Sequence, residues 1–366
     1  MAKHKFIFIL GTRPEVIKLS PLILELQKYS GEVCVINTGQ QGELTEDFLK
    51  HFSINPTHSF ILPSNRSLNL DLAKIITDIH SVLKNYDANN GVVFVQGDTS
   101  SALAGAVAGF NLGFTVAHIE AGLRTRDKKG PYPEETYRTI ITNLADLHFA
   151  PTQIAQQNLI TDGIKSNQIT ICGNTGIDSL VQTMKTVKQG NKDGQKYILV
   201  TLHRRENFGE TIYKVTEMLA GLSKELPNSI IHFVTHTNPN VLDSYHIKFK
   251  ESEKIIKLAP QSYIDFVELL SNSDLIITDS GGLQEESAFL GIPLIVVRDL
   301  TERSEVLSEN CLLLSTNAIT IKQAIINCFQ NQEFIKQYKK STTVFGDGKS
   351  AELIASKLKK MGMLRS

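Results

Sequence analysis

The sequence has few cysteines and no excess of charge of either sign. Its 366 residues include 38 basic and 38 acidic side chains, so the formal net charge is zero. A dedicated nucleic-acid-binding protein needs a basic face that neutralises phosphates, and this balance disfavours that class. The four cysteines form no Cys-x-x-Cys pair, which favours reduced, buried thiols over a disulfide framework or a zinc site. They are Cys34, Cys172, Cys311 and Cys328.

Long apolar runs are also lacking. Near the start only residues 6–10 are continuously apolar, whereas a secretion signal needs roughly 7–15 such residues. The longest uncharged stretch, 99–119, has three glycines, several polar residues and few large aliphatic side chains. We interpret it as a helix followed by a buried strand, although a membrane span has a similar length of ~20 residues. The sequence therefore predicts a cytoplasmic protein without membrane contact.

Several motifs of common enzyme classes are missing. The chain has no Gly-x-x-x-x-Gly-Lys-Ser/Thr motif, and no Gly-x-Gly-x-x-Gly follows its first predicted strand. A P-loop nucleotidase and an NAD-binding enzyme are therefore disfavoured. There is no Gly-x-Ser-x-Gly and no His-Glu-x-x-His, the patterns of many hydrolases and zinc enzymes. We predict no cofactor and no metal.

Length and composition predict two α/β domains. The length corresponds to roughly two domains of about 150 residues, and a hydrophobic fraction of 41% excludes disorder as the main state. Short apolar runs alternate with helical patterns, which predicts parallel sheets with right-handed crossovers. The predicted strands are 6–10, 33–37, 92–96, 114–119, 147–150, 197–201, 230–234, 275–278 and 293–297. The predicted helices are 14–29, 68–85, 100–110, 210–226 and 283–290.

The two halves of the chain repeat one pattern. Strand 92–96 leads to Gly-Asp-Thr (97–99), a helix and strand 114–119; strand 275–278 leads to Asp-Ser-Gly-Gly (279–282), a helix and strand 293–297. We therefore predict two facing, Rossmann-like, doubly wound domains that divide near 172–175. Ligands bind beyond the carboxyl ends of strands in such sheets. The polar clusters at these ends are expected to share one cleft between the domains.

A glycine pair opens the predicted helix in the second half. Ser280, Gly281 and Gly282 place backbone N–H groups at a helix start, which is a natural seat for phosphate. Glu286 lies about one turn further along the helix, where it can accept hydrogen bonds from a ribose diol. The alternative is a tight turn before a solvated acidic helix start, which the helix dipole also favours.

Two cations follow the first predicted strand. Arg13 lies in the loop after it, and Lys18 lies in the first turns of helix 14–29. Cations at a helix N-terminus oppose the helix dipole. This unfavourable position favours a role in gripping a diphosphate over a merely solvated helix start.

Carboxylates occur at the same strand ends. Asp98 and Glu120 lie at the ends of predicted strands, and Glu134 or Glu135 follows a rigid Pro-Tyr-Pro stretch (131–133) before a helix. The alternative for each is a structural salt bridge or a helix cap. Their common placement, together with a histidine and a lysine, points to proton-transfer chemistry. The candidate groups are Asp98, Glu120, Glu134, His203 and Lys18.

Eight short motifs follow one another along the chain: Gly-Thr-Arg-Pro-Glu-Val-Ile-Lys (11–18), Gly-Asp-Thr (97–99), His-Ile-Glu-Ala-Gly-Leu-Arg-Thr (118–125), Pro-Glu-Glu (133–135), Gly-Asn-Thr (173–175), His-Arg-Arg-Glu-Asn (203–207), Asp-Ser-Gly-Gly-Leu-Gln-Glu-Glu (279–286) and Arg-Asp-Leu-Thr-Glu-Arg (298–303). Over essentially the whole chain they resemble the non-hydrolysing UDP-N-acetylglucosamine 2-epimerases. The resemblance implies a two-domain fold of the glycosyltransferase-B type, in which the final helix, near 350–360, packs back on the first domain. The expected domains are 1–172 plus 350–366, and a UDP-binding domain 173–349.

The resemblance also implies a function. The family inverts C2 of UDP-N-acetylglucosamine to give UDP-N-acetylmannosamine for surface polysaccharides, as a cytosolic homodimer. The implied route eliminates UDP, forms 2-acetamidoglucal and adds UDP back. By motif position the catalytic residues are Asp98, Glu120, Glu134 and His203, supported by Lys18. The implied substrate-binding residues are Arg13, Lys18, Arg138, His203, Ser280, Gly281, Gly282, Glu286 and Arg303.

The sequence departs from the family pattern after its second predicted strand. Where the family often has Gln-His-Arg, the chain has Thr-Gly-Gln-Gln-Gly-Glu (38–43). In bacterial members this segment belongs to a second, regulatory sugar-nucleotide site. Loss of the histidine and arginine argues against unaltered activation by substrate, and it leaves a related UDP-N-acetyl sugar open as the substrate. The remaining candidates for a regulatory site are Gln40, Glu43, Arg66, Arg204 and His236.

Three rival functions stay open. A glycosyltransferase of the same fold would hold UDP but would not need carboxylates on both sugar faces. A hydrolysing 2-epimerase would release the free sugar, and the intact Thr-Arg-Pro-Glu run (12–15) argues against it. A non-catalytic sugar-nucleotide sensor would not need the candidate proton carriers, all of which are present.

Overall fold

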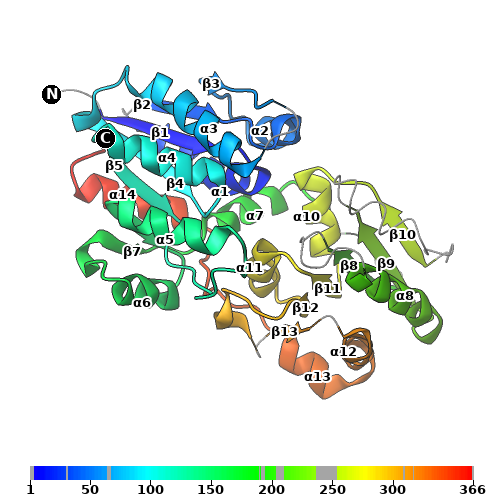
Figure 1. Ribbon diagram of the computed structural model, residues 1–366. Coiled ribbons are helices and arrows are strands. Elements are labelled where there is room, and N and C mark those ends of the chain that lie inside the picture. The colour runs from blue at the N-terminus through cyan, green and yellow to red at the C-terminus, as the bar shows by residue number, and fades with distance from the viewer. Residues whose placement is uncertain are drawn as a thin grey trace. The chain divides into compact units, whose positions relative to one another are not determined.

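The computed structural model describes residues 4–29, 32–63, 67–188, 190, 194–202, 210–235, 254–307, 310–315 and 317–364 (Figure 1). The chain forms two compact units: unit 1 is Met1–Val181 with Val344–Ser366, and unit 2 is Gln182–Thr343. Residues 173–181 and 344–349, which the sequence pattern assigns to the second domain, thus group with unit 1. The reason lies in their contacts: Ser179 donates a hydrogen bond to the Ile17 carbonyl, and Asp178 accepts one from the Ala351 N–H at 2.8 Å.

Unit 1 is built on a parallel sheet. Within the described residues it has seven strands in the order β3-β2-β1-β4-β5-β6-β7. The strand order reverses between β1 and β4, which is where ligands bind in doubly wound sheets. The strands are β1 (Lys5–Leu10), β2 (Glu32–Asn37), β3 (His58–Ser59), β4 (Gly91–Gln96), β5 (Thr115–Ile119), β6 (Leu147–Ala150) and β7 (Ile169–Ile171).

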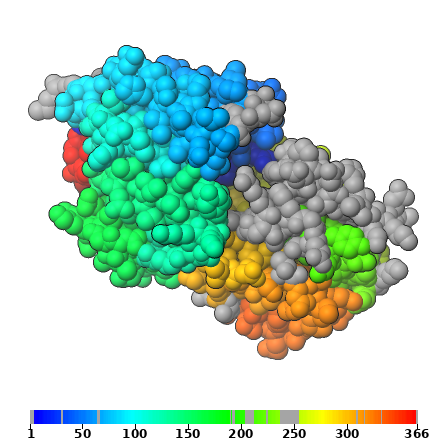
Figure 2. Space-filling model, viewed as in Figure 1, coloured from blue at the N-terminus to red at the C-terminus, as the bar shows by residue number. Residues whose placement is uncertain are grey.

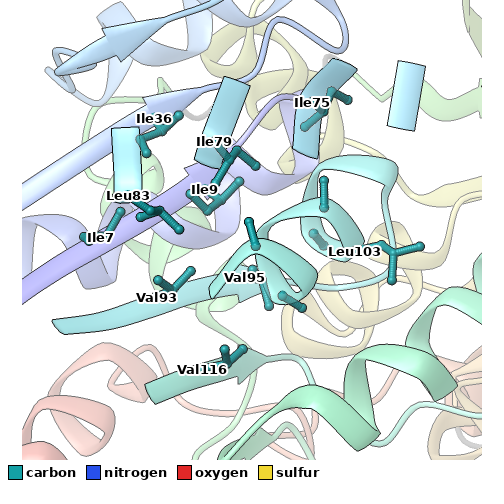
Figure 3. Close-up of a cluster of buried hydrophobic side chains, with 14 of the residues drawn as sticks. Ile7, Ile9, Ile36, Ile75, Ile79, Leu83, Val93, Val95, Leu103 and Val116 are labelled. Carbon is teal, nitrogen blue, oxygen red and sulfur yellow. The ribbon is translucent and has the colours of Figure 1, made fainter. Parts of the chain in front are cut away.

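Helices cover both faces of this sheet. Ile7 and Ile9 point to one face, where they pack with Ile75 and Ile79 of α3 and with α4 (Figure 3). Side chains alternate between the two faces along a strand, so Phe8 lies on the other face, stacked on Phe94 at 4.7 Å between ring centroids. The helices are α1 (Arg13–Leu26), α2 (Glu46–His51), α3 (Leu68–Leu83), α4 (Ser100–Asn111), α5 (Glu134–Leu144), α6 (Gln153–Thr161), α7 (Thr175–Met184) and α14 (Ser350–Lys360).

The C-terminal helix α14 completes unit 1. It contacts α1, which in turn contacts β1 and β4, and the red C-terminal segment lies beside the cyan and green segments of this unit in Figure 2. Ile354 and Leu358 of α14 are fully buried. The expectation that the final helix packs on the first domain is confirmed.

Unit 2 repeats the architecture. Its described strands form a parallel sheet in the order β10-β9-β8-β11-β12-β13, with the reversal between β8 and β11. Leucine, isoleucine and valine side chains of the sheet pack with α8 and α12 in one core. The strands are β8 (Lys196–Thr201), β9 (Ser229–Val234), β10 (Ile255–Leu258), β11 (Leu275–Thr278), β12 (Leu294–Val297) and β13 (Cys311–Leu314). The helices are α8 (Glu210–Glu225), α10 (Tyr263–Ser271), α11 (Gly281–Leu290), α12 (Ala318–Gln330) and α13 (Gln332–Tyr338).

The uncharged stretch 99–119 forms α4 and β5, as predicted. Across the part of the chain that the structure describes, no helix has both the length and the apolar character that a bilayer crossing requires. The four cysteines are all buried and free, as predicted.

Candidate functional site

The segments that follow three strands of unit 1 carry the candidate chemical groups; Arg13, expected in the loop after the first strand, is instead the first residue of α1, because Thr12 is the N-cap. Arg13 follows β1, Asp98 follows β4 and Glu120 follows β5. These strands are neighbours and parallel, so their carboxyl ends lie along one edge of the sheet, at the reversal of strand order. The prediction that these residues occupy one edge is confirmed.

Glu120 is a buried carboxylate that accepts hydrogen bonds from the side chains of three residues. Lys18 and Asn174 donate to its Oε1, the latter at 2.8 Å, and Gln96 donates to its Oε2. The side chain of Glu120 is only 5% exposed, and that of Lys18 is 11% exposed. Glu120 has φ +65°, a left-handed conformation that is uncommon for residues other than glycine. A carboxylate this deeply buried requires charge compensation, which Lys18 supplies.

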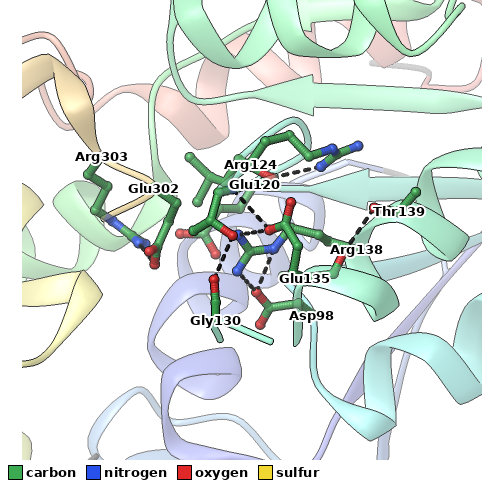
Figure 4. Close-up of polar contacts among 12 residues, drawn as sticks. Asp98, Glu120, Arg124, Gly130, Glu135, Arg138, Thr139, Glu302 and Arg303 are labelled. Carbon is green, nitrogen blue, oxygen red and sulfur yellow. Dashed lines mark hydrogen bonds and ion pairs between the residues drawn. The ribbon is translucent and has the colours of Figure 1, made fainter. Parts of the chain in front are cut away.

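Asp98 is held differently. Arg138 donates to Asp98 Oδ2 from Nε at 3.0 Å and from Nη2, and to Glu135 Oε2 from Nη1 at 3.1 Å. Figure 4 shows the Arg138 guanidinium between these two carboxylates. The Asp98 side chain is 26% exposed whereas that of Arg138 is 5% exposed. Asp98 is therefore a charge-compensated carboxylate with a face open to solvent.

The adjacent glutamates at the start of α5 have separate roles. Glu135 is buried and accepts hydrogen bonds from the backbone N–H groups of Thr125 and Arg126 at 3.1 and 2.9 Å. It therefore fixes the loop after β5 and orients Arg138. Glu134 is half-buried, and this makes it the better candidate of the two for contact with a ligand. The residues alone left this choice open, whereas the position in the family motif favoured Glu134.

Glu15 joins two of the site loops. It accepts hydrogen bonds from the N–H groups of Gly11 and Thr12 at 2.9 and 2.8 Å and from the hydroxyls of Thr12 and Thr99. It thereby forms the capping box of α1 and links the start of that helix, where Arg13 lies, to Thr99, the residue after Asp98. Burial raises the pKa of Glu15 to about 7, although the hydrogen bonds stabilise the ionised form and act to lower the pKa.

The segment after β2 is tied to its neighbours by glutamines. Gln40 accepts hydrogen bonds from the N–H and hydroxyl of Ser101 at 2.9 and 2.6 Å, and Gln41 accepts one from the Arg13 N–H at 2.9 Å. Glu43 is exposed, in a short 3-10 helix. The other regulatory candidates, Arg66, Arg204 and His236, and the catalytic candidate His203 lie outside the described residues. The regulatory site stays a prediction.

In unit 2 the predicted phosphate seat lies at the start of α11. Ser280 is the N-cap, and its side chain makes no capping hydrogen bond. The first N–H groups of a helix have no partner within the helix, so those of Gly281 and Gly282 suit an anion. Glu286 is half-buried on the same helix. This arrangement is compatible with the predicted diphosphate and ribose contacts, which stay predictions.

Arg303 sits in a chain of buried charges behind this helix start. It donates to Glu302, which lies beside it in Figure 4, and to Glu285. Glu302 also accepts from Arg298 at 3.1 Å. A Cβ added at Gly281 would lie 2.5 Å from Arg303 Nη1, so only glycine lets the guanidinium pack there. The carboxylates of Glu285 and Glu302 thus compensate the charge of Arg303. The contact of Arg303 with a diphosphate stays a prediction.

Among the residues described, no group of three or more histidine, cysteine, aspartate or glutamate side chains is arranged to hold a metal ion. Unit 1 contributes carboxylates paired with cations, and unit 2 contributes the backbone N–H groups at the start of α11. Such an arrangement can bind anions and transfer protons.

Comparison with known proteins assigns the chain. The family model described as UDP-N-acetylglucosamine 2-epimerase matches residues 24–359. The chain belongs to this family. A relative from Bacillus subtilis (strain 168), named UDP-N-acetylglucosamine 2-epimerase, is 35% identical over 98% of this chain and 96% of its own length.

Solved structures agree with the UDP-N-acetylglucosamine 2-epimerase assignment. The UDP-GlcNAc 2-epimerase from Neisseria meningitidis, bound to UDP-GlcNAc, matches with a TM-score of 0.92 and 33% identity over 97% of this chain and 100% of that one. The Methanocaldococcus jannaschii UDP-GlcNAc 2-epimerase, in complex with UDP-GlcNAc and UDP, matches with a TM-score of 0.86 and 32% identity over 97% of this chain and 99% of that one. The two-domain fold expected from the family resemblance is confirmed.

Sequence reasoning missed four residues that hold the site together. They are Glu15, Gln96, Asn174 and Glu302. Glu15, Asn174 and Glu302 lie inside family motifs, which was an available signal, but motif membership does not reveal a contact. Gln96 ends an otherwise apolar strand run and directly precedes Gly-Asp-Thr (97–99), and that placement was its only signal.

Proposed function

We propose that the protein interconverts UDP-N-acetylglucosamine and UDP-N-acetylmannosamine by epimerisation at C2. The observation that carries the proposal is the pair of carboxylates at adjacent strand ends, Asp98 held by Arg138 and Glu120 held by Lys18. Family membership along nearly the whole chain supports it, as does the related Neisseria meningitidis enzyme that binds UDP-GlcNAc.

The chemistry explains why two carboxylates are useful. The proton on C2 of the sugar is not acidic, because no carbonyl group is adjacent to C2. In the proposed route a base removes this proton while the C1–O bond breaks and UDP leaves with the electron pair, which gives 2-acetamidoglucal. Re-addition places a proton on the opposite face of C2 and the UDP oxygen on C1. Proton carriers are therefore needed on both faces of the sugar.

The residue roles follow from this route. We assign proton transfer to Asp98, Glu120, Glu134 and His203, with Lys18 stabilising developing charge. We assign the diphosphate to Arg13 and to the α11 start at Ser280, Gly281 and Gly282, and the ribose to Glu286. Arg138 orients Asp98, a role that its two hydrogen bonds to this carboxylate support. Arg303 acts on the diphosphate either directly or by positioning Gly281.

The physiological setting is part of the same proposal. We infer a cytoplasmic homodimer that supplies UDP-N-acetylmannosamine for surface polysaccharide synthesis. The four free, buried cysteines suit a reducing compartment. Light scattering of the purified protein measures the oligomeric state, and a mass of one chain would contradict the dimer.

The decisive experiment follows the reaction by NMR in D2O. Purified protein is incubated with UDP-N-acetylglucosamine, and we expect deuterium at C2 of both epimers while UDP remains attached. Release of free N-acetylmannosamine would indicate a hydrolysing epimerase instead. Absence of C2 exchange would contradict epimerisation of this substrate and favour a transferase, a sensor or a related UDP-N-acetyl sugar.

A further inference from the structure

The motif Gly-Asn-Thr (173–175) has no role in the proposed chemistry, yet its asparagine reaches the site. Asn174 is buried just before α7, where its backbone N–H donates to the Phe345 carbonyl at 2.6 Å. Its side-chain Oδ1 accepts from the Gly176 N–H at 3.0 Å, and its Nδ2 donates to Glu120 Oε1 at 2.8 Å. Asn174 is thus fixed at three points, and one of them is the catalytic carboxylate.

Gln96 holds the other oxygen of the same carboxylate. It is the last residue of β4, is 2% exposed, and donates from Nε2 to Glu120 Oε2. The two amides therefore bind Glu120 from different elements and on different oxygens. A carboxylate that accepts hydrogen bonds from neutral amide donors is stabilised in its ionised form.

The surrounding charges favour the same state. Lys18 of α1 donates to Glu120 Oε1. His118 of β5 also interacts electrostatically with Glu120, but burial lowers the pKa of His118 to about 3, so its ring is neutral near pH 7. A Cβ added at Gly97 would lie 3.4 Å from Glu120 Oε2, so the backbone at Gly97 packs close to this oxygen.

We propose that Asn174 and Gln96 are positioning residues that keep Glu120 ionised and hold its carboxylate in one orientation for proton transfer. The proposal rests on the proposed epimerase function for its kinetic consequence. The charge state of Glu120 is a property of the protein alone and can be measured without turnover.

The test replaces single amide nitrogens by oxygen. Asn174→Asp keeps an Oδ1 acceptor for the Gly176 N–H, but it puts an acceptor oxygen where Nδ2 now donates to Glu120. Two carboxylates in contact cannot both ionise freely, so the protonation midpoint of Glu120 should rise by at least about one pH unit. Gln96→Glu makes the same change next to Oε2, from the end of β4. It tests the proposal on its own if Asn174→Asp fails to fold.

Asn37→Asp is the matched control. Asn37 is also a buried asparagine at a strand end whose Oδ1 accepts a backbone N–H, that of Gly39 at 3.1 Å, but its Nδ2 faces the Thr45 hydroxyl at 3.5 Å. Its replacement introduces the same atom in the same unit without touching Glu120. We expect this variant to leave both the Glu120 midpoint and the pH profile of turnover unchanged.

Two measurements separate the outcomes. Carbon-13 NMR of glutamate-labelled protein, with the Glu120 signal assigned from its loss in Glu120→Gln, gives the midpoint directly. The pH profile of kcat should show its acidic limb moved upward by the same amount in both site variants, with UDP affinity unchanged within about twofold. An unshifted Glu120 midpoint in both variants overturns the inference, whereas a shifted midpoint in a protein that exchanges no C2 proton would overturn only the epimerase function.

Discussion

At the scale of single residues, the Asp98 side chain is more exposed than that of Glu120, the other candidate proton carrier that is paired with a cation. Asp98→Asn keeps the shape and removes the charge, so we expect turnover to fall by roughly 10²–10⁴, the usual contribution of a general acid or base. UDP affinity should stay within a few-fold, because the proposed phosphate seat is in unit 2. Asp127→Asn, at an exposed loop position of the same unit, is the control. Epimerisation by Asp98→Asn at more than about a tenth of the parent rate would remove Asp98 from the proton carriers.

Two histidines and one glutamate give the free energy of unfolding opposing dependences on pH. His118 and His148 lie opposite each other on β5 and β6, and burial lowers their pKa values to about 3 and about 4. Their contribution to stability is therefore complete above their unfolded pKa of about 6.5 and is lost as the pH falls toward 4 and 3. Glu15, with its pKa raised to about 7, acts oppositely and contributes stability that is lost as the pH rises from about 4.5 through 7.

The histidines of unit 1 with a lowered pKa, which also include His51, outnumber the carboxyl groups with a raised pKa, Glu15 and Asp178. We therefore expect unit 1 to lose stability on acidification from pH 6.5 to 4.5. Each histidine contributes a slope of up to ~1.4 kcal/mol per pH unit. His148→Gln removes one titrating ring and should make the acid dependence shallower by about that amount. Urea unfolding of both proteins across this pH range is the measurement. An equal slope in parent and variant would show that His148 is not held neutral by burial.

At the scale of secondary-structure elements, the two glycines at the start of α11 should respond in opposite ways to alanine. A Cβ at Gly281 would lie 2.5 Å from Arg303 Nη1, whereas a Cβ at Gly282 meets nothing within 4 Å. Gly281→Ala should therefore displace buried Arg303 and destabilise unit 2 by about 1–3 kcal/mol. Gly282→Ala should be neutral or stabilising by ~0.5–1 kcal/mol, because alanine is the better helix former.

The same pair of variants tests the phosphate seat. If the diphosphate lies against the open side of Gly282, its alanine variant should bind UDP at least about tenfold more weakly, ~1.4 kcal/mol, while remaining fully folded. Calorimetric titration with UDP alongside thermal unfolding separates the two effects. A stable Gly282→Ala protein with parent affinity would place the phosphates elsewhere.

The elements differ in how well the sequence predicts them. Continuously apolar strands such as β4 and β5, and long amphipathic helices such as α3 and α8, follow from local pattern and were predicted nearly to their observed bounds. The edge strands β3, β7, β10 and β13 were not predicted. β3 has two residues and β10 includes a charged lysine, so they form by pairing with an existing neighbour and leave little periodicity in the sequence.

The site shows the same division between local and distant information. Asp98 and Glu120 could be predicted as site residues because each lies after a predicted strand, and parallel topology brings the ends of such strands together. The position in the family motif favoured Glu134 over Glu135, but no spacing rule gives the contact of Glu135 with the backbone N–H of Thr125. Asn174 reaches Glu120 across 54 positions of sequence. Contacts of this kind depend on how the folded elements pack, and local patterns in a single sequence do not predict them.

At the scale of the whole molecule, unit 1 is assembled from two pieces of chain that unit 2 separates. Residues 344–366 return to unit 1, where α14 packs on α1 and Phe345 accepts the backbone hydrogen bond of Asn174. The C-terminal segment therefore supports both the helix that carries Lys18 and the asparagine that holds Glu120. Substitutions that destabilise α14 should therefore reduce the proposed activity by destabilising unit 1, although α14 carries none of the proposed catalytic groups.

Leu358→Ala tests this dependence against Lys360→Ala. Leu358 is fully buried, whereas Lys360 is exposed two residues further along the same helix. Loss of a buried leucine costs about 2–5 kcal/mol, whereas an exposed helical lysine replaced by alanine changes stability by less than about 0.5 kcal/mol. We expect Leu358→Ala to reduce amide hydrogen-exchange protection in α1 and α7, to lower the temperature at which turnover is lost, and to leave protection in β8, β11 and α11 unchanged. Equal loss of protection in both units would mean that the chain unfolds as one cooperative body, and unchanged protection in α1 would mean that α14 does not stabilise the helix that carries Lys18.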